Sequence, residues 1–211
     1  MNMTLDPDYD RSGCSQPPTS QLPILWIDGV GGYLLVDRSQ ASLGQAAAGN
    51  RVDIGIVADL SRQAGVVRRV DSDYLLQPLQ LDTQVNGECV DRPRLLRHGD
   101  LIGFGPRVRL RFGKPHPLSA TASLELSGCG RFQPHVDRVL LLHETCLIGP
   151  QAGSHVVCPQ WQSEVLLVRR GAQWVIRSSQ ELEVNGRLQR EPIALLSGLR
   201  IRGADFSLSI E

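Results

Sequence analysis

The amino-acid sequence predicts an all-β fold made of two tandem antiparallel β-sandwiches. First, most apolar residues alternate with polar ones in short runs that Gly, Pro, Asn and Asp separate. Second, no window of helical length keeps apolar residues on one helix face without an interrupting Gly or Pro. Third, the second part of the chain repeats motifs of the first part. Many short strands with turn residues between them are typical of β-sandwiches.

The predicted strands begin after a polar N-terminal segment. Residues 1–22 are rich in Ser, Pro, Gln and Asp and contain few side chains to bury, so we expect a flexible tail. From Pro23 onward almost every apolar run has a period of two. The clearest run is RVRLRF at residues 107–112, in which Val, Leu and Phe share one face of a strand and three arginines share the other.

Two runs are apolar without alternation. Residues 139–142 read VLLL and residues 165–168 read VLLV, which is the pattern of a strand covered on both faces. We expect Trp161 and Trp174 inside a sandwich core and Trp26 in the first strand, with the anchoring of a partner as the alternative role for each.

An internal repeat predicts the domain organisation. Three pairs of segments carry it: 85–102 with 184–201, 33–44 with 139–149, and 108–112 with 206–210. The prolines within residues 113–122 exclude a central strand and suit a linker or an edge. We therefore expect one sandwich at residues 23–112 and a second at residues 123–211.

Each repeat contains one Asn-Gly pair flanked by strand-like residues. Asn86-Gly87 and Asn185-Gly186 fit a type I′ turn, which needs a positive φ at both central positions. We expect two β-hairpins at these pairs and no direct role in binding.

Composition argues against several classes of protein. The 22 cationic side chains balance 22 anionic ones, which disfavours nucleic acid as a partner. No apolar run approaches the roughly 20 residues that span a bilayer, and the N-terminus does not resemble a secretory signal, so we expect a cytoplasmic protein without a membrane partner. The five cysteines form no CxxC pair and lack histidines at metal-ligand spacing. Free thiols, no metal and no other cofactor are expected.

A set of short motifs follows in order along the first repeat. They are Leu43-Gly44, Asp53-Ile54, Ser61-Arg62, Val-Asn-Gly at 85–87 and LLRHGDLI at 95–102. The set resembles the forkhead-associated (FHA) domain, a β-sandwich family whose members bind phosphothreonine peptides on loops at one end. The resemblance covers residues 24–112 and, more weakly, 132–211. It implies a non-enzymatic module that binds a protein partner, with Ser61 and Arg62 in a phosphopeptide site.

A phosphothreonine site needs convergent donors and positive charge, because the phosphate carries a charge of about −1.5 to −2 and three acceptor oxygens. Ser61 offers its hydroxyl and its backbone N–H. The chain departs from the family pattern at Gln45, which replaces an arginine, at Ala64, which replaces a bracing histidine, and in lacking an Asn-Gly-Thr element. Loss of the family arginine is expected to lower the affinity about ten- to a hundred-fold. Arg51 or Arg62 is the candidate to replace its charge. The predicted site is Ser61, Arg62, Arg51 and Gln45.

The second repeat retains less of the family pattern. Pro150 follows Gly149 where the family has an arginine, and WQSEV at 161–165 takes the place of the Ser-Arg segment. Glu164 would repel a phosphate. We expect this repeat to serve packing or a different binding surface.

Two other interpretations of the same residues stay open. In the first, both repeats are degenerate scaffolds that bind a protein without phosphate, through a strand edge or an apolar patch. In the second, Ser61 is the nucleophile of a hydrolase, with His98 or His143 brought near it as the base. The surrounding DLSRQ is not a Gly-x-Ser-x-Gly elbow. The glycines at 28–32 predict a hairpin turn, because no Gly-Lys-Ser/Thr follows them.

Overall fold

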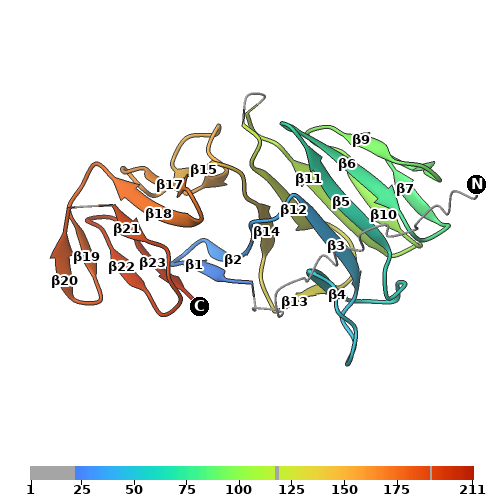
Figure 1. Cartoon of the computed structure of the whole chain (residues 1–211), viewed down its shortest axis with the longest axis horizontal. Coiled ribbons are helices and arrows are strands. Elements are labelled where there is room, and N and C mark those ends of the chain that lie inside the picture. Colours follow the sequence, from blue (N-terminus) through green and yellow to red (C-terminus); the bar gives the residue numbers. More distant parts are fainter. Residues whose placement is uncertain (1–21, 117–118, 191) are drawn as a thin grey trace, which may run out of the picture.

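The computed structural model describes residues 22–116, 119–190 and 192–211, and every helix or strand element in these ranges is a β-strand (Figure 1). The predicted all-β fold is therefore confirmed. No described segment forms a helix long and apolar enough to cross a membrane. The expected tail lies, apart from Leu22, outside the described residues.

The largest of three sheets has twelve strands. From one edge to the other they are β20 (Arg187–Gln189), β19 (Leu182–Val184), β22 (Arg200–Arg202), β23 (Ser207–Ile210), β1 (Ile24–Ile27), β2 (Gly31–Val36), β14 (Arg138–Leu141), β12 (Ala122–Leu126), β11 (Val108–Gly113), β10 (Leu101–Phe104), β7 (Thr83–Val85) and β8 (Glu88–Cys89).

Two smaller sheets pack against it. The six-stranded sheet consists, in order, of β13 (Arg131–Gln133), β4 (Ile54–Val57), β3 (Gln40–Gln45), β5 (Gly65–Val70), β6 (Asp73–Pro78) and β9 (Arg94–Leu96). The five-stranded sheet consists of β16 (Val156–Val157), β15 (Thr145–Gly149), β17 (Val165–Arg170), β18 (Gln173–Ser178) and β21 (Ile193–Ala194). The pairs β2·β14, β3·β4 and β15·β16 are parallel, so the sheets are mixed rather than wholly antiparallel.

The sheet order reproduces the repeat seen in the sequence. We call β1 to β11 the first repeat and β12 to β23 the second repeat. β12 corresponds to β1, β14 to β2, and β15 to β23 correspond in order to β3 to β11, while β13 is an addition. From one edge to its centre the twelve-stranded sheet runs β20, β19, β22, β23, β1 and β2, and from the other edge the corresponding strands follow in the same order: β8, β7, β10, β11, β12 and β14. The two halves of the sheet meet at the parallel pair β2·β14.

The two repeats exchange their first two strands. β1 pairs with β23, the last strand of the second repeat, and Leu25 lies opposite Ile210. The corresponding β12 pairs with β11, the last strand of the first repeat, and Leu124 lies opposite Phe112. Strands of both repeats therefore complete each packed unit. The boundary expected at 113–122 separates the repeats along the chain but does not separate the packed units.

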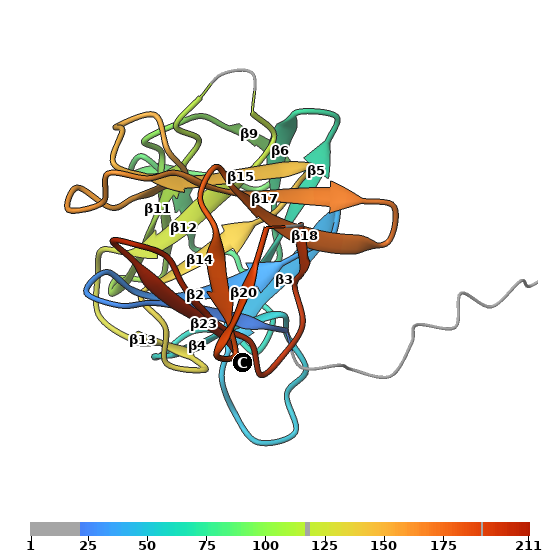
Figure 2. The same cartoon turned by 90° about the vertical axis from the view of Figure 1, so that its left-hand side faces the viewer.

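The central strands serve two cores on opposite faces of the twelve-stranded sheet. In β2, Leu34 and Val36 belong to the first core, beneath the six-stranded sheet, whereas Tyr33 and Leu35 belong to the second core, beneath the five-stranded sheet. This alternation follows from the two-residue period of a strand. Figure 1 shows β1, β2 and β14 between the two ends of the molecule, and Figure 2 shows β17 and β18 in a layer apart from β23.

The two continuously apolar runs have different environments. Residues 139–142 are covered on both faces, as predicted, because Val139 and Leu141 belong to the first core and the leucines after each of them belong to the second. The same prediction for residues 165–168 is wrong, since alternate residues of this run are only partly buried. The reason is that β17 lies in the five-stranded sheet, which packs on a core through one face.

Several local predictions are confirmed. The RVRLRF run lies in β11 from Val108 onward, with its Val, Leu and Phe fully buried in the first core. Trp161 and Trp174 are buried in the second core, and Trp26 lies in β1. Both Asn-Gly pairs make hairpin turns, with φ of 54° and 85° at residues 86 and 87 and of 48° and 82° at residues 185 and 186.

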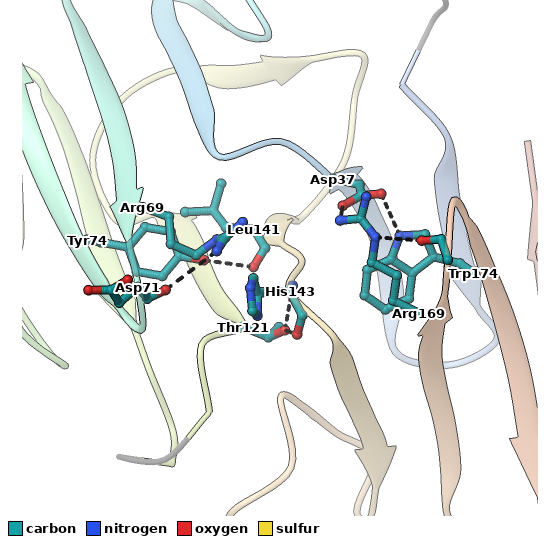
Figure 3. Close-up of polar contacts among 10 residues, drawn as sticks. Asp37, Arg69, Asp71, Tyr74, Thr121, Leu141, His143, Arg169 and Trp174 are labelled. Atoms are coloured by element: carbon teal, nitrogen blue, oxygen red, sulfur yellow. Dashed lines mark hydrogen bonds and ion pairs between the residues drawn. The ribbon is translucent and has the colours of Figure 1, made fainter.

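Polar contacts join the packed units beside the shared strands (Figure 3). Asp37, which follows β2, accepts hydrogen bonds from Trp174 Nε1 and Arg169 Nη1, each at 2.8 Å. On the first-core side, the Tyr74 hydroxyl donates to the Ala120 carbonyl at 2.7 Å, and the Leu141 carbonyl oxygen lies 3.2 Å from the same hydroxyl. The end of β2 is thereby tied to β17 and β18, and β6 is tied to β14.

Candidate functional site

The predicted site residues lie at one end of the first packed unit. Three loops carry this end: residues 46–53 between β3 and β4, residues 58–64 between β4 and β5, and residues 79–82 between β6 and β7. We call these three loops the rim. Ser61 and Arg62 lie in its middle loop.

The end of β3 approaches the middle loop closely. The Gln45 N–H donates to the Ser61 carbonyl at 3.0 Å. A Cβ atom at Gly44 would lie 1.9 Å from the Arg62 carbonyl oxygen, so this contact requires glycine. The Leu43-Gly44 motif therefore has a packing reason in this chain.

Asn50 braces the rim. Its Nδ2 donates to the Gln45 carbonyl at 2.6 Å and to the Arg62 carbonyl at 2.8 Å. Ala64, which stands where the family pattern has a bracing histidine, is fully buried and uses its backbone N–H to bond the Leu43 carbonyl at 2.8 Å. Sequence reasoning missed Asn50, because a single Asn in a polar loop carries no recognisable motif.

Gln80 holds the middle loop from the other side. Its Oε1 accepts the Ser61 N–H at 3.0 Å, and its Nε2 donates to the Asp82 carboxylate. The Thr83 hydroxyl donates to the Gln80 carbonyl at 2.7 Å, which fixes the loop that presents the amide. One expectation is thereby corrected: the Ser61 backbone N–H is not free for a ligand, since a neutral amide oxygen occupies it.

The remaining polar groups of the predicted site face solvent. Ser61, Arg62 and Arg51 are exposed, and within residues 22–116, 119–190 and 192–211 no group bonds the Ser61 hydroxyl or either guanidinium. Gln45 is half-buried and its Nε2 donates to the Ala58 carbonyl at 3.3 Å. The structure thus places Gln45, Ser61 and Arg62 together, and Arg51 follows Asn50 in the loop bonded to Arg62.

Asp53 of the Asp-Ile motif has a structural role. Its carboxylate accepts hydrogen bonds from the Ser42 N–H at 2.9 Å and the Ser42 hydroxyl at 2.7 Å. Arg38 adds an ion pair at 2.5 Å. These contacts fix the end of the loop that carries Arg51 and Asn50.

The histidines considered as partners for Ser61 are bonded elsewhere or lie elsewhere in the fold. His98 lies in the turn after β9, where its Nδ1 accepts the Lys114 N–H at 3.0 Å. His143 follows β14 at the junction of the packed units (Figure 3). In the described part of the chain no histidine hydrogen-bonds Ser61, so the hydrolase interpretation lacks a base at this serine.

A different serine–histidine pair lies in the second packed unit. Ser119 Oγ and His155 Nε2 are 2.6 Å apart, and His155 Nδ1 accepts the Leu147 N–H at 2.9 Å. Because Nδ1 accepts, the neutral ring carries its proton on Nε2 and donates it to Ser119. Burial also lowers the pKa of His155. The ring therefore holds the serine as a donor and cannot take its proton as a base.

No described trio of His, Cys, Asp and Glu side chains is placed to hold a metal ion. The four described cysteines are free thiols: Cys89, Cys129, Cys146 and Cys158. Burial raises the pKa of Cys146 to about 12 and that of Cys158 to about 11, so both are inert thiols at neutral pH.

Comparison with known proteins identifies no family: no family model matches the chain, and no curated protein matches it.

Proposed function

We propose that the chain is a non-enzymatic protein-interaction module that binds a phosphothreonine peptide on the rim. The observation that carries the proposal is the Asn50 brace, which bonds the carbonyls of both Gln45 and Arg62. It holds the two loops together while the Ser61 hydroxyl and the Arg62 guanidinium stay exposed. An exposed hydroxyl on a braced backbone, beside a flexible cation, is a suitable donor set for a phosphate.

The proposed recognition is weak. Gln45 cannot supply the charge of an arginine, and Gln80 occupies the Ser61 N–H. A charge-assisted hydrogen bond contributes about 1.5–3 kcal/mol against about 0.5–1.5 kcal/mol for a neutral one. A phosphate can therefore displace the Gln80 amide from Ser61 with a net gain.

The test is a titration of the whole chain with phosphothreonine peptide libraries and their unphosphorylated counterparts. Ser61→Ala and Arg62→Ala should each weaken binding of the phosphorylated peptides about tenfold. Arg97→Ala is the matched control, because Arg97 is also exposed but lies in the turn between β9 and β10. Equal binding of both libraries, insensitive to Ser61→Ala, would remove phosphate from the proposal.

A second candidate function is binding of a protein partner without phosphate. Its support is the exposed edge strand β20, where Leu188 is 69% exposed, together with Leu196 at 59%. A groove of about 540 Å³ beside this edge has a mixed lining, in which Ile193, Leu196 and Leu199 lie beside Asn185, Arg187 and Gln189. An unpaired strand edge beside such a groove suits addition of an extended segment. A partner whose affinity is unchanged by phosphatase treatment and reduced by Leu188→Asp would support this candidate.

A further inference from the structure

The second repeat contains a loop that hydrogen-bonds a carboxylate of its own chain. This loop, residues 158–164 between β16 and β17, corresponds to the Ser61–Arg62 loop of the first repeat. Asp205, in the turn between β22 and β23, accepts hydrogen bonds through Oδ2 from the Gln162 N–H and, at 3.1 Å, from the Ser163 N–H. Its Oδ1 accepts the Ser163 hydroxyl at 2.7 Å.

The donors around this carboxylate are held in place by other residues. Ser163 is 5% exposed, and Gln180 Nε2 donates to its hydroxyl oxygen at 2.5 Å. Gln180 Oε1 also accepts the Ala204 N–H at 3.4 Å, so one amide joins the loop to the turn that carries Asp205. Two successive backbone N–H groups and a fixed hydroxyl form an anion-binding nest. The hydrogen bonds from Gln162 and Ser163 lower the pKa of Asp205.

The two repeats use corresponding loops with different occupants. Gln80 and Gln180 each follow the second strand of a corresponding hairpin, β6 and β18, and each holds the serine of the neighbouring loop. In the first repeat the backbone donor at Ser61 meets a neutral amide oxygen. In the second repeat the donors at Gln162 and Ser163 meet a full negative charge. A neutral occupant is easier for an external anion to displace than a carboxylate.

We propose that the Gln162–Ser163 loop is a second oxyanion-binding site, which Asp205 closes and which binds a phosphate group when Asp205 is displaced. A tethered carboxylate competes at an effective concentration of about millimolar or more, so the closed state dominates over ordinary phosphate levels. Glu164, the exposed residue directly after Ser163, adds a second negative charge to this loop, which repels an external anion. This site does not depend on phosphopeptide binding at the rim.

The experiment is a titration of isotope-labelled whole chain with inorganic phosphate, followed through the amide resonances of Gln162 and Ser163. The wild-type amides should not shift at about 10 mM phosphate, which is the range in which the tethered carboxylate competes. In Asp205→Ala the two amides should shift saturably, with a midpoint at a phosphate concentration at least tenfold below that of the wild type. The added change Glu164→Gln should lower this midpoint further, because it removes a negative charge. The double variant Asp205→Ala/Ser163→Ala should lose the effect.

Two controls make every outcome decisive. Asp91→Ala removes one exposed carboxylate next to β8, at the first-repeat edge of the twelve-stranded sheet, and should leave the Gln162 and Ser163 amides unaffected by phosphate. Asp205→Asn keeps an acceptor and removes the charge, so it serves if Asp205→Ala fails to fold. If phosphate does not shift the Gln162 and Ser163 amide resonances in the folded Asp205 variants, the loop is not an anion-binding site. If phosphate shifts these resonances saturably in the wild type at about 10 mM, Asp205 does not close the site. Tighter binding of phosphothreonine peptide than of inorganic phosphate would identify a peptide as the source of the phosphate.

Discussion

Single side chains determine the geometry of the rim. Asn50 and Gln80 add side-chain hydrogen bonds to the backbone contacts that join the three loops, and neither residue belongs to a motif. Ser61 and Arg62 could be selected from the sequence because the order of short motifs around them is informative. Their bracing residues could not, because an amide side chain can bond any nearby carbonyl or N–H, and proximity is decided by folding.

One residue predicts a pH dependence of stability. Burial lowers the pKa of His155 below its ordinary value of 6.5, and Nδ1 must stay unprotonated to accept the Leu147 N–H. Above pH 6.5 the ring is neutral in both folded and unfolded chains, and stability is unaffected. As the pH falls below 6.5 the unfolded chain binds the proton more readily, so the free energy of unfolding falls until the folded pKa is passed.

Urea denaturation from pH 7.5 to 4.5 measures this effect. As the pH is lowered over this range, we expect the free energy of unfolding to fall more for the wild type than for His155→Gln. The difference should be about 1.4 kcal/mol for each pH unit that separates the folded-state and unfolded-state pKa of His155. His135→Gln, which changes an exposed histidine, should follow the wild type. Parallel curves for the wild type and His155→Gln would contradict the prediction.

At the scale of elements, β14 is the strand on which both cores depend. Its continuously apolar run predicted that other layers would cover both faces of the strand, and in β14 they do. The same pattern in β17 led to the same prediction, but one face of β17 is only partly buried. A run of branched apolar residues shows that a strand is largely buried and does not show which layers cover it. That depends on which sheet the strand joins, and β14 joins the sheet shared by both repeats.

Truncations on the two faces of β14 should therefore both be costly. Leu140→Ala opens a cavity in the second core and Leu141→Ala opens one in the first, and each side chain is at most 2% exposed. We expect each to lower the free energy of unfolding by about 2–5 kcal/mol, measured by urea denaturation. Leu188→Ala, on the exposed edge, should change it by no more than about 0.5 kcal/mol. A small effect of either truncation in β14 would show that the strand is not packed on that face.

At the scale of the whole molecule, the exchange of strands makes the two repeats interdependent. The first core needs β12 and β14 from the second repeat, and the second core needs β1 and β2 from the first. Asp37 strengthens the connection, since it lies at the end of β2 and bonds Arg169 and Trp174 of the second repeat. The molecule should therefore unfold as one unit although it has two cores.

Separated repeats test this interdependence. Residues 23–112 and residues 123–211, produced apart, should each lack a native circular dichroism spectrum and a cooperative urea transition, because each leaves one edge of its core uncovered. Co-expression of the two fragments should restore both properties in a stable heterodimer. Independent cooperative folding of either fragment would show that β1 or β12 can return to its own repeat.

The sequence by itself determined the strand period, the positions of the two Asn-Gly turns, the duplication and the Ser61–Arg62 segment, because these are local or repeated patterns. Only the tertiary structure decided which repeat each strand completes. β1 and β12 are both short strands with apolar residues, and they pair with equivalent last strands, β23 and β11, so local pattern cannot distinguish the pairings. The occupants of the two equivalent loops, a neutral amide at Ser61 and a carboxylate at Ser163, were likewise decided by side chains brought from distant parts of the chain.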